Sequence, residues 1–541
     1  MNLVQDPWLT FKYRDGTVQQ RPMNAIADPN VVDFALPKAD FQGAAYQFAI
    51  GLLQTVLAPD DRGGWRALYD NAPAQEELQS AFNSVAHAFN CTGPGPLFMQ
   101  DLDPLEDSEC TTVAALLIDA PGDNGVKKNT DHFIKRGVGS SMSVAMANMA
   151  LFTLQTNAPS GGSGNRTGLR GGGPLTTLIL AQKLDACLWQ KLWLNVINKE
   201  FWRYDEPDLR SALVFPWLAE TKLSNSAGTE IFSVDVHPLH MYWAMPRRIR
   251  LVLAEGHAVC QLSGERVDLS VSEYRAKNHG GNYKGGWQHP LTPYKRDPNN
   301  PEQDSLSLKG QPGGITYKIW NFLLYSSSDI GQKCAQNIQH YYHLCSGFPV
   351  LKSESPRLWA FAYDMDNMKP RGWYSNIMPF FSIEMESQDL VLLRVKELQK
   401  LAADALWQCR TQIKTAWFER PADAKGDFSF IDLAFWQRSE TAFFVVVEQL
   451  ITNDQKSNFR LTPPQAKTWL KTVCDLATDL FDEYALAELG SQRSIAKKIK
   501  ARQVLTKWLT ASKIVKDYIQ ENNIHENNIQ EKHSKQLEVA S

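Results

Sequence analysis

A glycine-rich stretch, residues 159–173, carries the residue types that could bind an anion. Seven of its residues are glycine, and Arg166 and Arg170 are its only charged residues. Glycine allows positive φ and lets backbone N–H groups approach a large polar ligand, and the arginines favour an anionic one. A flexible surface linker is the alternative interpretation of this composition. We refer to residues 159–173 as the glycine loop.

Known phosphate-binding and nucleophile motifs do not fit the glycine loop. The pattern Gly-x-x-x-x-Gly-Lys-Ser/Thr is absent, and a dinucleotide fingerprint needs a strand before the loop and a helix after it. The stretch from Gly161 to Asn165 ends in Asn where a nucleophile elbow has Gly. A nucleotide-dependent enzyme that binds phosphate through this loop stays as the alternative function. The sequence offers it no nucleophile–base pair and no paired carboxylates.

A second irregular segment, residues 119–141, places four basic residues around Phe133. Cations suit the phosphates of a nucleic-acid strand and an aromatic ring suits a base. The alternative is a solvated loop in which Phe133 is buried.

Histidine and cysteine spacing does not indicate a metal site. His237 with His240, and His340 with His343 and Cys345, lack a further ligand at metal-like spacing, so we expect structural roles for them. The eight cysteines contain no Cys-x-x-Cys pair, which argues against a disulfide framework. We expect no metal and no cofactor.

The composition is that of a soluble globular protein. The chain has 541 residues, 43% of them hydrophobic and 21% charged, with a formal net charge of −3, and it is long enough for two or more domains. The N-terminus lacks the basic and apolar regions of a signal peptide, and no apolar run approaches the ~18 residues of a membrane span. We expect a cytoplasmic protein without membrane contact.

The secondary-structure elements that must position these segments follow two different sequence patterns, one on each side of about residue 380. Residues up to about 380 alternate strands, turns and helices, including a helix over Ala39–Leu57 and a buried strand over Pro174–Leu180 at the exit of the glycine loop. From about Met385, apolar residues recur at three- and four-residue steps. The residues of this first helical face are Val391, Val395, Leu398, Ala402, Ala405, Cys409, Ile413 and Ala416.

Three further helical segments follow, near 428–453, 463–487 and 491–520. Four long helices with short breaks are typical of a four-helix bundle. The sequence therefore predicts an α+β fold class. The expected parts are a large mixed α/β N-terminal domain over 1–380, a C-terminal four-helix bundle over 385–520 and a disordered tail over 521–541.

The last helical segment is strongly basic. Such a run is typical of a solvated helical face, but its imbalance also suits a polyanion or an acidic partner. Its basic residues are Arg493, Lys497, Lys498, Lys500, Arg502, Lys507, Lys513 and Lys516.

Six motifs occur in order along the chain: Asn2-Leu-Val-Gln-Asp-Pro-Trp8, Pro96-Leu-Phe-Met-Gln100, Gly168-Leu-Arg-Gly-Gly-Gly-Pro-Leu-Thr-Thr177, Tyr242-Trp-Ala-Met-Pro-Arg-Arg248, Trp287-Gln-His-Pro290 and Tyr363-Asp-Met-Asp-Asn-Met-Lys369. Together with the helical C-terminal segment, they resemble the CasA family, the large subunit of the type I-E CRISPR surveillance complex Cascade.

The resemblance implies a non-catalytic subunit of a crRNA-guided complex. It implies that the subunit recognises a short flanking motif, the PAM, in double-stranded DNA, largely from the minor groove. It also implies a role in opening the duplex to start R-loop formation and in recruiting a helicase-nuclease. The implied partners are crRNA, the target duplex and its displaced strand, the backbone, handle-binding and small Cascade subunits, and the helicase-nuclease.

The resemblance also implies DNA-binding residues. Lys277 is the best match to the family's lysine finger, with Lys284 as the alternative. A wedge that splits the first base pairs falls at Asp366, Asn367 and Met368, without a glutamine that the family can carry there. The residues that resemble the family's glycine loop are Ser160, Gly161, Gly162, Ser163, Gly164, Asn165 and Arg166.

Two further surfaces are implied by the resemblance. Asn129, His132 and Phe133 resemble the family's anchor onto the 5′ handle of the crRNA and the adjacent backbone subunit. The bundle is implied to face the displaced strand or partner subunits through Lys497, Lys498, Lys500 and Arg502. Relatives can carry cysteine pairs for zinc after the Met-Pro-Arg-Arg stretch, but Cys260 stands alone here, so we expect no zinc.

Overall fold

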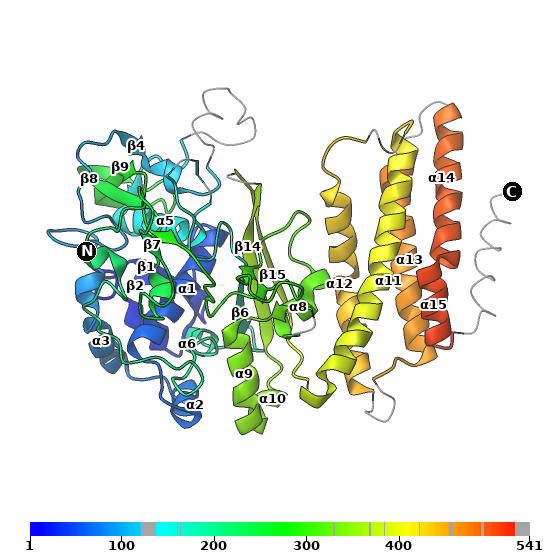
Figure 1. Ribbon diagram of the computed structural model, residues 1–541, viewed down its shortest axis with the longest axis horizontal. Helices are drawn as coiled ribbons and strands as arrows, with labels where there is room; N and C mark the ends of the chain where they lie inside the picture. The colour runs from blue at the N-terminus through cyan, green and yellow to red at the C-terminus, as the bar shows by residue number, and fades with distance from the viewer. Residues whose placement is uncertain are drawn as a thin grey trace. The chain divides into compact units, whose positions relative to one another are not determined.

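Figure 1 shows the chain as a computed structural model. Two compact units make up the chain: Met1–Gln311 with Phe322–Phe380, and Pro312–Asn321 with Phe381–Ser541. The periodicity of the sequence does not single out Pro312–Asn321 as part of the second unit. The structure describes residues 1–120, 137–159, 161–162, 164–327, 330–366, 369–383, 385–420, 422, 424–453, 459–487 and 492–524.

Helix α1 (Ala39–Val56) runs through the core of the first unit, with nearly all of its residues buried. It confirms the helix predicted over Ala39–Leu57. Two of its glycines allow close packing: a Cβ on Gly43 would lie 2.9 Å from the Phe361 ring, and one on Gly51 would lie 3.1 Å from Tyr242. A Cβ at residue 43 would therefore force the Phe361 ring to move, and one at residue 51 would press on the Tyr242 side chain.

The chain up to residue 380 also contains short helices and strands, of which α3, α5, α6 and α7 contact α1. The helices are α2 (Arg62–Asp70), α3 (Gln75–Asn83), α5 (Val144–Asn157), α6 (Leu188–Trp193), α7 (His240–Trp243), α8 (Trp320–Leu324), α9 (Gln336–Gly347) and α10 (Pro349–Ser353). The strands of three small sheets are β1 (Leu9–Tyr13), β2 (Val18–Arg21), β3 (Val31–Phe34), β7 (Glu230–Ile231), β10 (Asn282–Tyr283), β11 (Tyr294–Lys295), β12 (Leu306–Ser307) and β13 (Gln332–Lys333).

A long antiparallel hairpin dominates a four-stranded sheet. Strands β8 (Arg248–Val259) and β9 (Arg266–Lys277) pair from Arg248 opposite Lys277 to Val259 opposite Arg266. Two short strands, β4 (Cys110–Thr112) and β5 (Met142–Ser143), also pair with β9. The basic end of the hairpin thus brings together Arg248 and Lys277.

A second hairpin, β14 (Arg357–Asp366) and β15 (Lys369–Pro379), pairs with β6 (Thr176–Leu180) in the order β15-β14-β6. The five residues of β6 are all buried, which confirms the strand predicted at the exit of the glycine loop. Pro370 lies within β15, opposite Met365. The position tolerates proline because β15 is an edge strand.

The second unit is a helical bundle in which α11 (Met385–Trp417) packs against α12 (Ser429–Thr452), α13 (Pro463–Phe481) and α14 (Gln492–Ala511). The eight residues predicted for the inner face of α11 are all buried. Helices α11, α12 and α13 confirm the first three predicted helices. Among the described residues, no helix combines the length and apolar character needed to cross a membrane.

The last predicted helix, 491–520, is divided in two. Helix α14 ends at Ala511, and the Oγ of Ser512 accepts a hydrogen bond from the backbone of Val515 as the N-cap of α15 (Lys513–Glu521). Serine is favoured at this position because it satisfies a free N–H of the next helix. Periodicity alone does not reveal the break, since the apolar spacing continues across it. The predicted tail lies outside the described residues from residue 525 onward.

Candidate nucleic-acid interface

Several glycines of the loop take backbone conformations that other residues adopt at a cost. Gly162 and Gly164 have φ of +88° and +78°. Gly161 and Gly162 are exposed, and a Cβ on Gly161 would lie 2.7 Å from the Cβ of Asn165. The side-chain amide of Asn165 donates a 2.8 Å hydrogen bond to the carbonyl of Gly161, which closes the turn. The exposed part of the loop is thus a tight turn with little side-chain bulk.

One backbone hydrogen bond joins the glycine loop to the segment after β9. The amide of His279 donates to the carbonyl of Gly164 at 2.8 Å. The contact is close, since a Cβ on Gly164 would lie 2.7 Å from the Cβ of Asn278. Lys277, the predicted finger, is the last residue of β9 and precedes this contact by two positions.

Arg166 links the glycine loop to Ser224, which is in turn bonded to the segment after β9. Its guanidinium donates to both the hydroxyl and the carbonyl of Ser224, at 2.8 and 2.6 Å. The amide of Ser224 in turn donates to the carbonyl of His279 at 3.1 Å. In this structure Arg166 therefore supports the loop from within the protein.

Arg247 holds the entry of the loop and was not predicted as a site residue. Its guanidinium donates a hydrogen bond to the carbonyl of Pro159. The side-chain amide of Gln155 donates to the Arg247 carbonyl and the side-chain oxygen of Gln155 accepts from the Arg247 amide, both at 3.0 Å. Burial lowers the pKa of Arg247 to about 10. The only sequence signal for this role is its place in the basic Met-Pro-Arg-Arg motif.

Arg170 lies in the interior, with 5% of its surface exposed. Its guanidinium donates to Thr176, Thr292 and Gln47 at 3.1, 3.1 and 2.9 Å. We expected both arginines of the loop to favour an anionic ligand, but the burial of Arg170 keeps it from a DNA phosphate at the surface, so that expectation is wrong for Arg170 as a phosphate contact. It fails because two arginines close in sequence can lie on opposite sides of a loop that bends between them.

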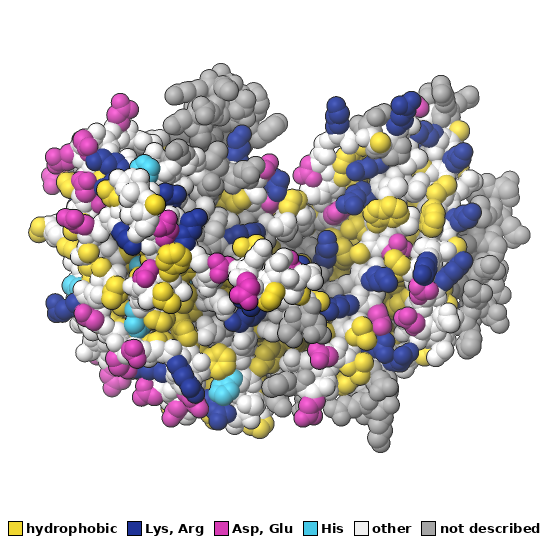
Figure 2. All heavy atoms as spheres, viewed as in Figure 1, with side chains coloured by type: hydrophobic (Ala, Val, Ile, Leu, Met, Phe, Trp, Pro, Cys, Tyr) yellow, Lys and Arg dark blue, Asp and Glu magenta, His cyan; other side chains and the backbone are white. Residues whose placement is uncertain are grey.

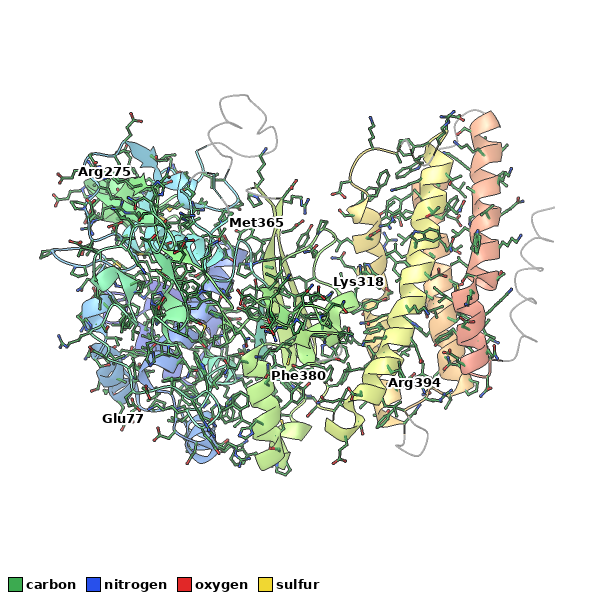
Figure 3. All side chains as sticks on the ribbon, in the orientation of Figure 1. Glu77, Arg275, Lys318, Met365, Phe380 and Arg394 are labelled. Carbon is green, nitrogen blue, oxygen red and sulfur yellow. The ribbon has the colours of Figure 1, made fainter. Side chains whose placement is uncertain are left out.

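The exit of the glycine loop packs against β14. A Cβ on Gly173 would lie 2.6 Å from the carbonyl oxygen of Tyr363 and 2.8 Å from the Met365 side chain, so only glycine fits. Met365 lies near the tip of the β14–β15 hairpin (Figure 3). The glycine loop thus contacts the segment after β9 at Gly164 and strand β14 at Gly173.

Asp366, the described member of the predicted wedge, lies at the hairpin tip opposite Lys369. Its side chain is 62% exposed and lies 3.8 Å from Arg371. Arg371 also makes a two-pronged contact with the buried carboxylate of Asp364, at 2.8 and 2.9 Å. This contact spans the register shift between Asp364 and Met365 and braces the hairpin just below its tip.

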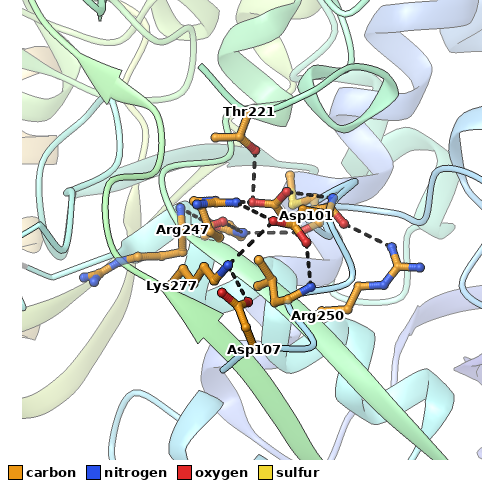
Figure 4. A network of polar contacts seen from close by, with 11 residues as sticks. Asp101, Asp107, Thr221, Arg247, Arg250 and Lys277 are labelled. Carbon is orange, nitrogen blue, oxygen red and sulfur yellow. Dashed lines mark hydrogen bonds and ion pairs between the residues drawn. The ribbon is translucent and has the colours of Figure 1, made fainter. Parts of the chain in front are cut away.

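The ammonium group of Lys277 is held by carboxylates. It lies 2.5 Å from Asp107 and 3.8 Å from Asp103 (Figure 4). The hydrogen bond from Lys277 lowers the pKa of the Asp107 carboxyl. Arg248 in the opposite strand contacts Asp101 at 2.5 Å and Asp103 at 3.2 Å, so acidic residues offset the basic hairpin end.

Lys284, the alternative finger, has an exposed side chain. Its backbone amide donates to Ile231 at 3.0 Å, beyond the β7–β10 pair. The hydrogen bond that joins this region to the glycine loop is made by His279, which lies closer in sequence to Lys277.

Several predicted residues lie outside the described part of the chain. These are Ser160 and Ser163 of the glycine loop, Asn367 and Met368 of the wedge, and Asn129, His132 and Phe133 of the handle anchor.

The four predicted basic residues of α14 differ in exposure. Lys500 is exposed, whereas Lys498 is 9% exposed. Lys497 donates to the carbonyl of Phe418, and Arg502 contacts Asp482 at 2.6 and 3.2 Å. Successive residues of a helix point in different directions, so basic residues that are close in sequence do not form one continuous basic surface. Figure 2 shows lysine and arginine side chains over the bundle, interspersed with apolar ones.

Two of the histidines flagged in the sequence, His237 and His240, have hydrogen-bond partners within the protein. His240 contacts the hydroxyl of Tyr283 at 3.0 Å, and burial lowers its pKa to about 4. His237 contacts the carbonyl of Asp205 at 2.9 Å. Within the described ranges, no three His, Cys, Asp or Glu residues gather as a metal site.

Comparisons with known proteins place this geometry in a family. The family model described as CRISPR-associated protein Cse1 matches residues 2–480. The crystal structure of Thermobifida fusca Cse1 superposes with a TM-score of 0.67 at 16% identity, covering 94% of this chain and 97% of that chain. Thermus thermophilus CasA (Cse1) gives 0.65 at 15% identity, covering 94% and 99%. A chain described as part of a CRISPR RNA-guided surveillance complex gives 0.62 at 15% identity, covering 93% and 99%. At such identities the structural likeness shows a shared fold.

Proposed function

The chain belongs to the Cse1 (CasA) family of CRISPR-associated proteins, and from this premise we propose that it is the non-catalytic large subunit of a crRNA-guided type I-E surveillance complex. In that complex it recognises the PAM in double-stranded DNA and helps to open the duplex next to it. The observation that carries the proposal is the Gly164–His279 hydrogen bond, because it places the exposed glycine turn beside Lys277.

The glycine turn and Lys277 have complementary roles in groove reading. A minor groove is narrow, so a backbone turn without bulky side chains can enter it and present N–H groups to base edges. Lys277 supplies a cation to the acceptors of the groove or to a flanking phosphate. To do so it leaves Asp107, and the DNA replaces the carboxylate as its partner.

The tip of the β14–β15 hairpin, around Asp366, acts as the wedge. Opening DNA costs about 1.4 kcal/mol per stacked step, and pairing with the guide returns a similar amount only afterwards. A wedge coupled to PAM binding lowers this first barrier. The brace between Arg371 and Asp364 supports the proposal, because a wedge must resist bending.

Two further contacts complete the proposed assembly. Asn129, His132 and Phe133 anchor the subunit to the crRNA handle, a role that rests on the family resemblance. On the bundle, Lys500 faces the displaced strand or a small subunit, since it is the exposed one of the four predicted cations. After R-loop formation the subunit helps to recruit the helicase-nuclease.

The structure weakens the case for the alternative function, a nucleotide-dependent enzyme that binds phosphate through the glycine loop. It would need the arginines of the glycine loop for phosphate, but Arg170 is buried and Arg166 is bonded to Ser224.

A gel-shift titration of the guide-loaded complex, with and without this chain, tests the proposal. The duplexes carry one target and differ only in the flanking trinucleotide. We expect flank-dependent tightening that requires this chain. Equal affinity for all flanks, with the chain present, would contradict PAM recognition and lead to a screen for turnover.

A further inference from the structure

A small cavity lies at the base of the glycine loop. Its volume is about 20 Å³, enough for one atom-sized ligand such as a water molecule or a halide ion. Its polar lining comes from α1, α5, the loop itself and the segment 241–289. The polar side chains around it are Gln47, Gln155, Thr156, Arg170, Tyr242 and His289.

The charge of Arg170 has no carboxylate partner among the described residues. Its three hydrogen-bond acceptors, Thr176, Thr292 and Gln47, are neutral. Burial lowers the pKa of Arg170 to about 10, so the group stays charged at neutral pH. A buried charge is costly unless a counter-charge compensates it.

A second cation adds to this imbalance. Lys309 donates to the backbone carbonyl of Arg170 and to the hydroxyl of Ser307. Burial and the neighbouring Arg170 lower the pKa of Lys309 to about 7. The region around the cavity is therefore electropositive.

Two side chains of the lining have a group that can donate a hydrogen bond to a ligand in the cavity. The hydroxyl of Tyr242 is buried and has no partner among the described residues. The Nδ1 of His289 accepts a hydrogen bond from the amide of Leu291 at 3.1 Å, so the neutral ring carries its proton on Nε2.

The side-chain oxygens of the lining amides are already used. Gln47 accepts from Arg170 at 2.9 Å, and Gln155 accepts from the amide of Arg247 at 3.0 Å. A cavity that offers donors and positive charge favours an anion over a water molecule, because water leaves the charge of Arg170 uncompensated.

We propose that this cavity is a binding site for a single monoatomic anion, of the size of chloride, which acts as the counter-ion of Arg170 and accepts a hydrogen bond from Tyr242. By compensating the charge of Arg170, the ion stabilises the exit half of the glycine loop. The backbone carbonyl of Arg170 accepts a hydrogen bond from Lys309, so this residue is fixed at both its side chain and its backbone. The proposal concerns the folded chain and does not depend on the DNA-binding role.

Thermal unfolding of the full chain tests the site. Sodium chloride and sodium gluconate are compared at equal ionic strength, because gluconate is too large for the cavity. We expect saturable stabilisation by chloride that follows ligand linkage. Equal unfolding temperatures in both salts would overturn the proposal.

Tyr242→Phe locates the effect, since it removes one hydroxyl and keeps the ring. We expect chloride to bind at least tenfold more weakly to this variant. Tyr317→Phe is the matched control, because its buried hydroxyl is bonded to Ser439 in the second unit. The control should keep the chloride dependence of the unchanged chain. Equal dependence in Tyr242→Phe would place any chloride site elsewhere and contradict the proposal.

Crystals grown in bromide give a direct readout. An anomalous peak beside Arg170 and Tyr242 is expected. A peak-free cavity that holds only a water molecule would overturn the proposal.

Discussion

The carbonyl oxygen of Gly164 and the backbone amide of His279 lie 2.8 Å apart and form a hydrogen bond between residues distant in the sequence. This bond fixes the glycine turn against the end of β9, next to Lys277. Because neither partner is a side chain, the link depends on backbone approach, which a Cβ at residue 164 would obstruct.

Gly164→Ala should weaken PAM-dependent binding. The new Cβ would lie 2.7 Å from Asn278 in a backbone with φ of +78°, so the turn must shift away from the segment that follows Lys277. We expect discrimination between PAM and non-PAM duplexes to fall about tenfold or more, at about 1.4 kcal/mol per decade. Gly16→Ala is the control, since Gly16 has φ of +87° in the turn between β1 and β2 with open space around it. If both variants discriminate equally well, the turn does not read the PAM.

Lys277 and Asp107 should respond to substitution in opposite directions. Lys277→Ala removes the cation, so duplex binding should weaken and the slope of log affinity against log salt should fall by about one. Asp107→Asn removes the competing carboxylate 2.5 Å away, so binding should tighten. A salt titration of affinity measures both. Should Lys284→Ala cause the loss instead, the finger would be Lys284.

Exposure should divide the basic residues of α14 into two classes. Replacing the exposed pair Lys500 and Lys507 with Ala should weaken binding of single-stranded DNA or of small subunits without changing the melting temperature. Arg502→Ala should instead lower stability by about 0.5–1 kcal/mol, because it breaks the partly exposed pair with Asp482. Lys471→Ala removes an exposed lysine from α13 as the control. Equal binding loss from Lys471→Ala would indicate a non-specific charge effect.

Lys309 should make stability depend on pH. Its folded pKa of about 7 lies below the ordinary 10.5, so between these values the unfolded chain binds more protons than the folded one. Stability should therefore rise with pH over this window, by at most about 1.4 kcal/mol per pH unit from this group. Urea unfolding in gluconate buffer, which excludes halide, measures the slope. Lys309→Met should flatten it relative to the unchanged chain, and an unaltered slope would show that Lys309 keeps its ordinary pKa.

The sequence predicted the elements whose pattern is local. The inner face of α11 follows from apolar spacing, and β6 follows from a β-branched run next to a glycine-rich segment. The division at Ser512 escaped prediction, because a serine cap inside a continuous apolar pattern is recognised only when the backbone is seen.

The candidate site was predicted as separate pieces, but its assembly was not. Arg166 and Arg170 look equivalent in sequence, yet one bonds to Ser224 and the other lies in the interior. Arg247 was missed because its role is to donate to the backbone of Pro159, a contact that has no sequence pattern. Such roles depend on long-range packing, which composition and spacing do not encode.

The attachments of the glycine loop at Gly164 and Gly173 reduce the conformational entropy that the loop can still lose on binding. Ordering a free residue costs about 1–2 kcal/mol of conformational entropy, so a fully mobile stretch of this length would bind DNA poorly. Here folding has already restricted the chain between the two attachments. Between Gly164 and Gly173, glycine therefore provides the shape of the loop rather than its mobility, and in the proposed DNA complex this part needs no separate ordering step.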